Sequence, residues 1–141
     1  MKTFVINLPD RKDRMQRFNA NNPYLEYETF KAVEGYKVGY EKLLSQGFDT
    51  DHNWIDPILK TPLTKGEVGC FLSHWHLWNK CIEKNEPIIV LEDDAILTDK
   101  FDVEEISKLK YDFVYLGWKE MDKSKDINAV SYTHLRAHET Q

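Results

Sequence analysis

The chain has little cysteine, no long hydrophobic run and no excess of basic residues. Only 2 of its 141 residues are cysteine, so a disulfide-rich secreted scaffold is excluded. No apolar stretch approaches the ~20 residues of a membrane-spanning helix. Lys and Arg number 19 against 24 Asp and Glu, a net charge of −5. Because proteins that coat nucleic acid present a basic face, we expect no nucleic-acid partner.

What is present suits a packed domain. The sequence is 41% hydrophobic and 13% aromatic, which is too apolar for a disordered chain. Its length fits one small domain or part of a larger one. These properties leave a soluble enzyme, a binding module or a fragment of either. A Walker loop, a Gly-x-Gly-x-x-Gly fingerprint and a Cys-x-x-Cys pair are all absent.

The cysteines and the first residues of the chain indicate the cellular compartment in which the protein is expected. Cys70 and Cys81 lie on one predicted helix, roughly 16 Å apart, so we expect two free, buried thiols in a reducing environment. The chain runs from Met1 directly into the short apolar stretch Phe4–Leu8, without the longer hydrophobic region and cleavage site of a secretory signal. We expect a cytoplasmic protein.

The first half of the chain predicts alternating elements. Phe4–Leu8 has the composition of a buried strand, and residues 10–20 that of a helix with Asp10 as its N-cap. The aromatic stretch Tyr24–Val33 indicates a second strand, and a short helix is expected near Tyr40–Leu44.

The clearest predicted helix covers Thr64–Lys84. Thr64 and Glu67 have the spacing of a capping box. Six residues recur at spacings of three and four and predict one apolar stripe: Val68, Phe71, Leu72, Trp75, Trp78 and Ile82.

The run Pro87–Leu91 is apolar without alternation, which indicates a strand covered on both faces, as in a parallel sheet. A helix at Val103–Leu109 and a strand at Phe113–Leu116, closed by Gly117, are expected to follow. The alternation of strands and helices predicts an α/β layered domain.

Three acids, Glu92, Asp93 and Asp94, directly follow that apolar strand. Ligands of open α/β sheets bind at the carboxyl ends of the strands, and clustered carboxylates suit Mg²⁺ or Mn²⁺. Such an ion would offset charge that develops on a diphosphate leaving group. A solvated acidic turn that ends a strand is the alternative.

Basic and polar residues can be expected near the same edge of the sheet. Arg11 and Arg14 follow the first strand and suit phosphate or carboxylate recognition, although a solvated helix face explains them equally well. Ser73 and His74 lie on the helix before the acids, and His74 shares a helix edge with Cys70. A histidine in that position is more often structural than catalytic. No nucleophile triad can be assembled.

Several segments together resemble glycosyltransferase family 25, the lipooligosaccharide galactosyltransferases and their collagen-glycosylating relatives. Each segment is modest alone, whereas their order and spacing are specific. They are Phe4–Leu8 with Arg11 and Arg14, Phe30–Gly35, Gly66–His74, Ile88–Ala95 and Tyr115–Gly117.

The resemblance implies a GT-A fold, a Rossmann-like sheet that binds a UDP-sugar with a divalent ion, usually Mn²⁺ and otherwise Mg²⁺. It implies Asp94 as the direct metal ligand, Glu92 at the other end of the acidic motif, and Asp93 nearer the ribose or sugar. The donor-binding residues that it implies are Leu8, Arg11, Arg14, Ala32, Ser73, His74 and Asp93.

The resemblance further implies transfer of galactose from UDP-galactose, with inversion, to a lipooligosaccharide or other glycan. Inversion requires a general base, which we expect further along a longer chain. The intact enzyme is expected at the cytoplasmic face of the inner membrane, with a saccharide or glycolipid acceptor. The alternatives are a non-catalytic module that binds nucleotide sugars and a metal-dependent phosphohydrolase, for which the sequence offers no nucleophilic Asp motif.

Residues 129–141 resemble the translation, in one frame, of a transposase adapter used in preparing sequencing libraries. An ordinary polar tail is the alternative. We therefore expect residues 1–128 to be the incomplete donor-binding part and 129–141 to be non-native, which removes His134 and His138 from any argument about a metal site.

Overall fold

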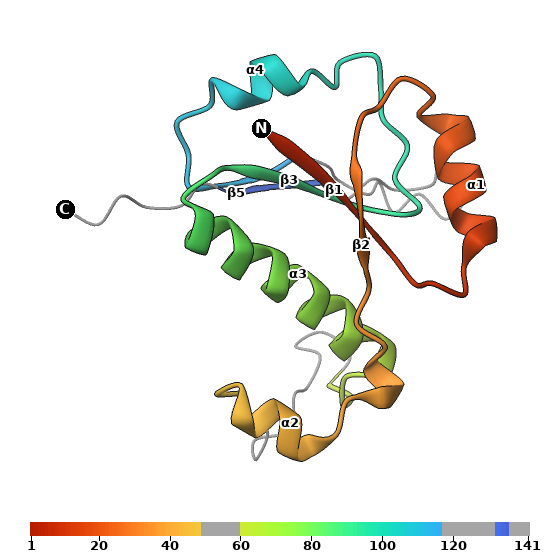
Figure 1. Cartoon of the computed structure of the whole chain (residues 1–141), viewed down its shortest axis with the longest axis vertical. Helices are drawn as coiled ribbons and strands as arrows, with labels where there is room; N and C mark the ends of the chain where they lie inside the picture. Colours follow the sequence, from red (N-terminus) through yellow and green to blue (C-terminus); the bar gives the residue numbers. More distant parts are fainter. Residues whose placement is uncertain (49–59, 117–131, 136–141) are drawn as a thin grey trace.

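The computed structural model describes residues 1–48, 60–116 and 132–135. Its strands form one sheet in the order β2-β1-β3-β5-β4 (Figure 1). The strands are β1 (Lys2–Asn7), β2 (Glu28–Lys31), β3 (Ile88–Glu92), β4 (Phe113–Tyr115) and β5 (Tyr132–Leu135). The helices are α1 (Lys12–Asn21), the 3-10 helix η1 (Gly35–Lys37), α2 (Tyr40–Ser45), α3 (Lys65–Lys84) and α4 (Val103–Ser107).

Parallel pairing of β1 with both β2 and β3 confirms the predicted Rossmann-like α/β arrangement. In the register of β1 and β3, Ile6 lies opposite Glu92. The end of β1 and the acidic residues at the end of β3 therefore meet at one edge of the sheet. Strand β5, which the sequence did not predict, runs antiparallel to both β3 and β4. Its residues belong to the segment 129–141, which is predicted to be translated adapter sequence. The structure does not test where this sequence comes from, so that stays a prediction.

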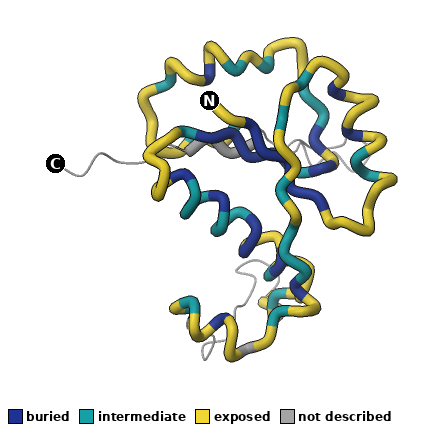
Figure 2. Tube along the Cα trace, viewed as in Figure 1, coloured by how far each residue is buried: buried dark blue, intermediate teal, exposed yellow. Residues whose placement is uncertain are grey.

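Helices cover both faces of the sheet, so the molecule has three layers (Figure 1). On one face Val5, Ile89 and Leu91 pack with Phe18 of α1 and Ile106 of α4. On the other face, successive residues of the same strands pack against α3, in a cluster of Phe4, Ile6, Leu77, Cys81, Ile88 and Val90. Burial is accordingly greatest along β1 and β3 (Figure 2). The prediction that both faces of β3 are covered is confirmed.

Helix α3 begins where the sequence predicted. The Thr64 hydroxyl accepts from the Glu67 amide at 3.2 Å, and the Glu67 carboxylate accepts from the Thr64 amide at 2.6 Å, which completes the capping box. The helix ends at Lys84 and is followed by Asn85, whose φ of +50° is left-handed. A long helix with both ends defined is a rigid support for the side chains that it directs toward β3.

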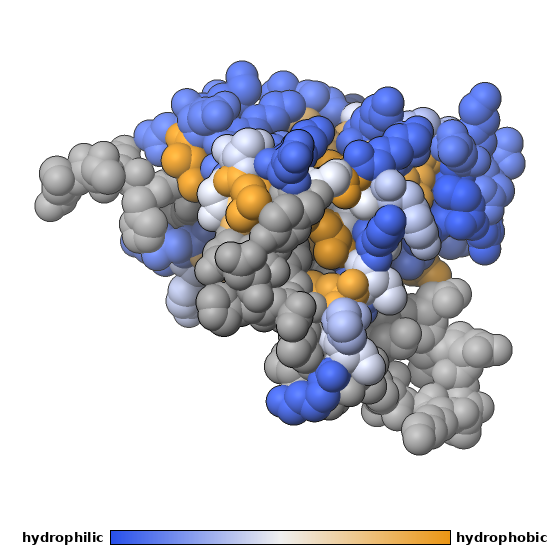
Figure 3. Space-filling view, turned by 90° about the horizontal axis from the view of Figure 1, so that it is seen from below, coloured by the Kyte–Doolittle hydropathy of each residue, from blue (hydrophilic) through white to orange (hydrophobic). Residues whose placement is uncertain are grey.

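Of the six residues in the predicted apolar stripe of α3, Leu72 alone is buried, and the rest of that prediction was wrong. The residues buried on this helix are Gly69, Leu72, Ser73, Leu77 and Cys81, whereas Ile82 is 65% exposed. Three other residues of the predicted stripe, Phe71, Trp75 and Trp78, belong to a separate aromatic cluster. In this cluster Phe48 packs edge-on against Phe71 and Trp75, and Phe71 packs edge-on against Trp78. Figure 3 shows hydrophobic side chains in the middle of one face of the molecule, with hydrophilic ones around its upper rim. Because α3 is apolar on two sides, spacing alone could not identify the side that faces the sheet.

Other boundaries also differ from the predictions. Helix α1 is preceded by Arg11 rather than by Asp10, and no side chain caps it. Strand β2 is shorter than predicted, and the 3-10 helix η1 was not predicted. The short helix expected near Tyr40–Leu44 is present as α2. Cys81 is buried as expected, but Cys70 is exposed. Gly117 lies outside the described residues. Within the described part of the chain, every helix is too short or too polar to cross a bilayer.

Candidate donor site at the carboxyl ends of β1 and β3

A cavity of about 450 Å³ lies at the carboxyl ends of β1 and β3. Its lining comes from four parts of the chain: the end of β1 with the start of α1, the segment after β2, the N-terminal half of α3, and the end of β3. Six of the seven predicted donor-binding residues line it, together with Glu92: Leu8, Arg11, Arg14, Ala32, Ser73 and Asp93. The parallel strands explain this convergence, since their carboxyl ends meet at the same edge of the sheet.

Asp93 is the most buried acid of the site. Its side chain is 7% exposed and lies 2.6 Å from the Arg14 guanidinium. The Asn7 side-chain amide donates to its other oxygen at 2.7 Å and to the Arg11 carbonyl at 3.2 Å. Burial raises the pKa of Asp93, while Asn7 and Arg14 oppose that rise. The carboxylate is thus held in a fixed orientation at the wall of the cavity.

Arg14 joins the acids to the basic end of α1. Besides Asp93 it contacts the Asp94 carboxylate at 3.0 Å, and the Asp94 side chain is 61% exposed. The same arginine also lines a neighbouring cavity of about 370 Å³ together with Arg11, Arg17 and Asp94. Asp94 therefore lies just outside the first cavity, on the far side of Arg14.

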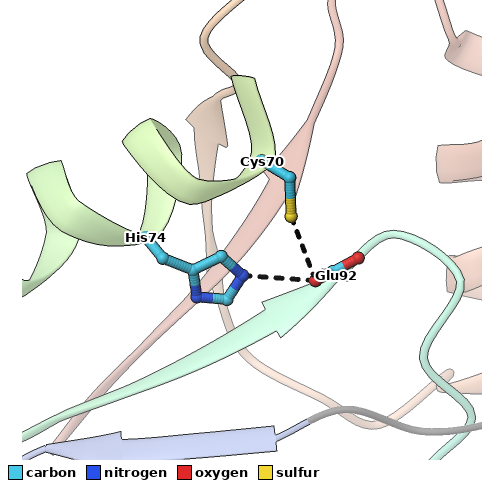
Figure 4. Close-up of side chains that lie close together, drawn as sticks. All are labelled: Cys70, His74 and Glu92. Atoms are coloured by element: carbon cyan, nitrogen blue, oxygen red, sulfur yellow. Dashed lines mark hydrogen bonds and ion pairs between the residues drawn. The ribbon is translucent and has the colours of Figure 1, made fainter. Parts of the chain in front are cut away.

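Glu92 faces helix α3 (Figure 4). One of its oxygens lies 3.2 Å from His74 Nε2 and 3.6 Å from Cys70 Sγ. The hydrogen bond from His74 lowers the pKa of Glu92. Although Cys70 is exposed as a residue, desolvation of its sulfur against β3, together with the negative charge of Glu92, raises the pKa of the thiol to about 12. In the described part of the chain these three side chains are the group whose ligand atoms could hold a metal ion, all within 4.8 Å of one another.

Ser73 holds two elements together. It is fully buried, accepts from the Val33 amide at 2.8 Å and donates to the Gly69 carbonyl at 2.7 Å. The hydroxyl therefore fastens the segment after β2 to α3. This contact and the close approach of Gly35 to Gly69 fix the distance between two walls of the cavity.

The structure thus brings most predicted site residues together and separates two of them. His74 does not line the cavity; it supports Glu92 from behind. Asp94 is not in the group of ligand atoms around Glu92, although both were predicted for one ion. Sequence interpretation missed Asn7 and the contact of Cys70 with Glu92. A lone polar residue within the apolar run Phe4–Leu8 was the available signal for Asn7.

Comparison with known proteins adds to the geometry. The model of a family described as glycosyltransferase family 25 (LPS biosynthesis protein) matches residues 1–140. The chain belongs to glycosyltransferase family 25. The resemblance inferred from the sequence motifs is therefore confirmed.

Curated family 25 members from animals are similar to this chain. Procollagen galactosyltransferase 2 of Mus musculus is 33% identical and covers 90% of the chain, and procollagen galactosyltransferase 1-B of Xenopus laevis is 35% identical and covers 85%. Inactive glycosyltransferase 25 family member 3 of Homo sapiens is 34% identical and covers 89%. The chain spans only about a fifth of the length of these relatives, at 22%, 21% and 23% respectively.

Proposed function

We propose that this chain is the donor-binding part of a family 25 galactosyltransferase, which transfers galactose from UDP-galactose to a saccharide or glycolipid acceptor with inversion. The observation that carries this proposal is the convergence of six predicted donor-binding residues, from four separate parts of the chain, on one cavity. Its volume of about 450 Å³ is within the range of about 300–1,000 Å³ for small-molecule sites.

The charges of the site support a diphosphate ligand. Arg14 is the cation closest to the buried acid, and Arg11 lines the same wall. Guanidinium groups bind phosphate oxygens in a bidentate manner, so both arginines suit the diphosphate. Asp93, held by Asn7, can then accept from a ribose or sugar hydroxyl. The apolar part of the lining, which includes Leu8 and Ala32, suits the flat face of a base.

The carboxylates at this edge of the sheet also suit the divalent ion that the family resemblance implies. Asp94 offers an exposed carboxylate at the end of β3, and oxygen ligands of this kind suit Mn²⁺ or Mg²⁺. We propose Asp94 as the ligand of this ion; Glu92, at the other end of the acidic motif, faces His74 of α3 instead. A bound ion would neutralise charge on the departing diphosphate. Arg14 contacts one oxygen of the same carboxylate, so its positive charge opposes binding of the ion.

Calorimetry on the 141-residue chain with UDP and Mn²⁺ tests the donor site. Asp94→Asn should weaken the Mn²⁺-dependent binding of UDP by about tenfold or more and leave the melting temperature unchanged, because the side chain is exposed. Glu83→Gln, an exposed acid toward the end of α3, is the matched control. Unaltered UDP and Mn²⁺ affinity in Asp94→Asn would contradict the proposal.

A second experiment distinguishes an enzyme from a binding module. The human relative is named as an inactive family member, which keeps a non-catalytic nucleotide-sugar-binding protein as the second candidate. A transfer assay on the longer protein with UDP-galactose, Mn²⁺ and a lipooligosaccharide or a procollagen chain as acceptor decides between them. Linkage of galactose to either acceptor supports transfer, and UDP binding without transfer supports the binding module. Release of inorganic phosphate from a simple ester would support a phosphohydrolase.

Fractionation of the cells that make the protein tests the expected location at the cytoplasmic membrane face.

A further inference from the structure

We propose that Cys70, His74 and Glu92 form a binding site for a thiophilic divalent cation of the Zn²⁺ type, separate from the ion expected at Asp94. Two of the side chains come from successive turns of α3 and the third from the end of β3 (Figure 4). Residues four apart lie on the same side of a helix, so Cys70 and His74 face β3 together. The proposal does not depend on the proposed function, because neither a donor sugar nor turnover enters it.

The distances fit a tetrahedral ion. Zn²⁺ bonds are about 2.3 Å to thiolate sulfur and about 2.0 Å to imidazole nitrogen or carboxylate oxygen. At the tetrahedral angle such bonds separate sulfur from oxygen by about 3.5 Å and nitrogen from oxygen by about 3.3 Å. The corresponding separations are 3.6 Å for Cys70 Sγ to Glu92 Oε1 and 3.2 Å for His74 Nε2 to the same oxygen. Two of the three separations between ligand atoms therefore match a tetrahedral ion, and all three atoms lie within 4.8 Å of one another.

The chemistry of the three ligands selects the ion. A soft thiolate with an imidazole suits Zn²⁺ and related ions, whereas Mg²⁺ and Mn²⁺ prefer oxygen ligands alone. The acidic motif at the end of β3 thus faces two different sets of neighbours. Glu92 is directed toward sulfur and nitrogen, and Asp94 toward the Arg14 guanidinium.

The site is open on one side. Cys70 is an exposed residue, and both Cys70 and Glu92 line the 450 Å³ cavity. Three protein ligands with a fourth position left to water are typical of zinc sites that bind or activate a ligand, whereas structural sites have four protein ligands. On binding, the Cys70 thiol loses its proton to solvent and its sulfur forms the bond to the metal. The fourth position then faces the cavity.

Titration of the chelator-treated 141-residue chain with Co²⁺, and then with Zn²⁺, tests the site. One equivalent of Co²⁺ should give a thiolate-to-cobalt charge-transfer band in the near ultraviolet, and Zn²⁺ should abolish the band by displacement. An excess of Mn²⁺ should leave it in place. Displacement by Mn²⁺ at equal concentration would overturn the assignment.

Variants identify the ligands. Even the outer partners of metal ligands contribute about 10- to 100-fold to affinity, so Cys70→Ser and His74→Ala should each weaken Zn²⁺ binding by at least about tenfold. Cys70→Ser should also remove the charge-transfer band. The matched controls are Cys81→Ala, the other cysteine of α3, and His76→Gln, which lies two residues beyond His74 and so on another side of the helix. Circular dichroism verifies folding, and Cys70→Ala replaces Cys70→Ser if the latter does not fold. A band that survives in a folded Cys70 variant would overturn the proposal.

Discussion

Gly69 of α3 and Gly35 of η1 contact each other through their backbones. A Cβ atom added at Gly69 would lie 2.5 Å from the Val33 carbonyl oxygen and 2.8 Å from the Gly35 amide nitrogen. One added at Gly35 would lie 1.7 Å from the Lys65 carbonyl oxygen. Both glycines line the candidate donor cavity. Two walls of the site are therefore as close as two backbones can be.

Gly69→Ala should lower the free energy of unfolding by about 2–3 kcal/mol, because the added methyl group meets backbone atoms that cannot turn away. Gly66→Ala on the same helix is the matched control. Its added Cβ meets only the Thr64 hydroxyl, at 3.8 Å, and alanine favours the helix by up to about 1 kcal/mol. Urea denaturation of the two variants measures the difference. Equal stability of both would contradict the close contact.

Ser73→Ala should destabilise the fold by about 1–3 kcal/mol, since it leaves the Val33 amide without its acceptor in a buried place. Ser45→Ala removes an exposed helix hydroxyl that donates to the Lys42 carbonyl, and should change stability by less than about 0.5 kcal/mol. Thermal melting compares them. If Ser73 acted mainly on the donor, its alanine variant would keep wild-type stability and lose UDP affinity alone.

Arg14→Gln should have opposite effects on the two proposed ligands. It releases Asp93 and Asp94 from their cation, so Mn²⁺ alone should bind more tightly. It also removes the guanidinium from the cavity, so UDP in the presence of chelator should bind at least about tenfold more weakly, because hydrogen bonds to charged groups contribute about 1.5–3 kcal/mol. Arg17→Gln, an exposed arginine paired with Asp13, is the control. Parallel losses of both affinities would argue against this arrangement.

Alkylation of Cys70 by iodoacetamide in the presence of chelator should be slow at neutral pH. Only the thiolate reacts, and a pKa of about 12 leaves on the order of 1000-fold less thiolate than an ordinary cysteine has. The rate should rise with pH well beyond pH 9, and Glu92→Gln should shift the profile to lower pH by removing the nearby negative charge. Mass spectrometry separates Cys70 from buried Cys81. A profile that is the same in Glu92→Gln would contradict the contact.

Local signals in the sequence predicted the elements that carry the site. The capping box at Thr64 and the continuous apolar run before Glu92 are patterns of residues that are close in sequence. The helix start and the buried strand that they predicted are both confirmed. That run indicated a parallel sheet, and parallel strands bring Arg14 to the same sheet edge as Asp93, where the two side chains form a salt bridge. Asp10 failed as a cap because the first turn of α1 begins one residue later than its composition indicated.

Contacts between distant segments could not be predicted in the same way. Phe71 and Trp78 have the helical spacing of a core stripe, yet Leu77 and Cys81 face the sheet, since the separate aromatic cluster covers the other side of α3. The contact of Cys70 with Glu92 likewise depends on how far α3 lies along β3, which no spacing within either segment specifies.

Strand β5 separates β3 from β4 in the sheet, so among the described strands β4 pairs with β5 alone. Removing residues 129–141 would expose the amide and carbonyl groups along one edge of β3, a strand that is apolar on both faces. An unprotected edge of this kind accepts a strand from another molecule. A chain cut at residue 128 should therefore self-associate as its concentration rises, and a solubilising strand in place of β5 should keep it monomeric.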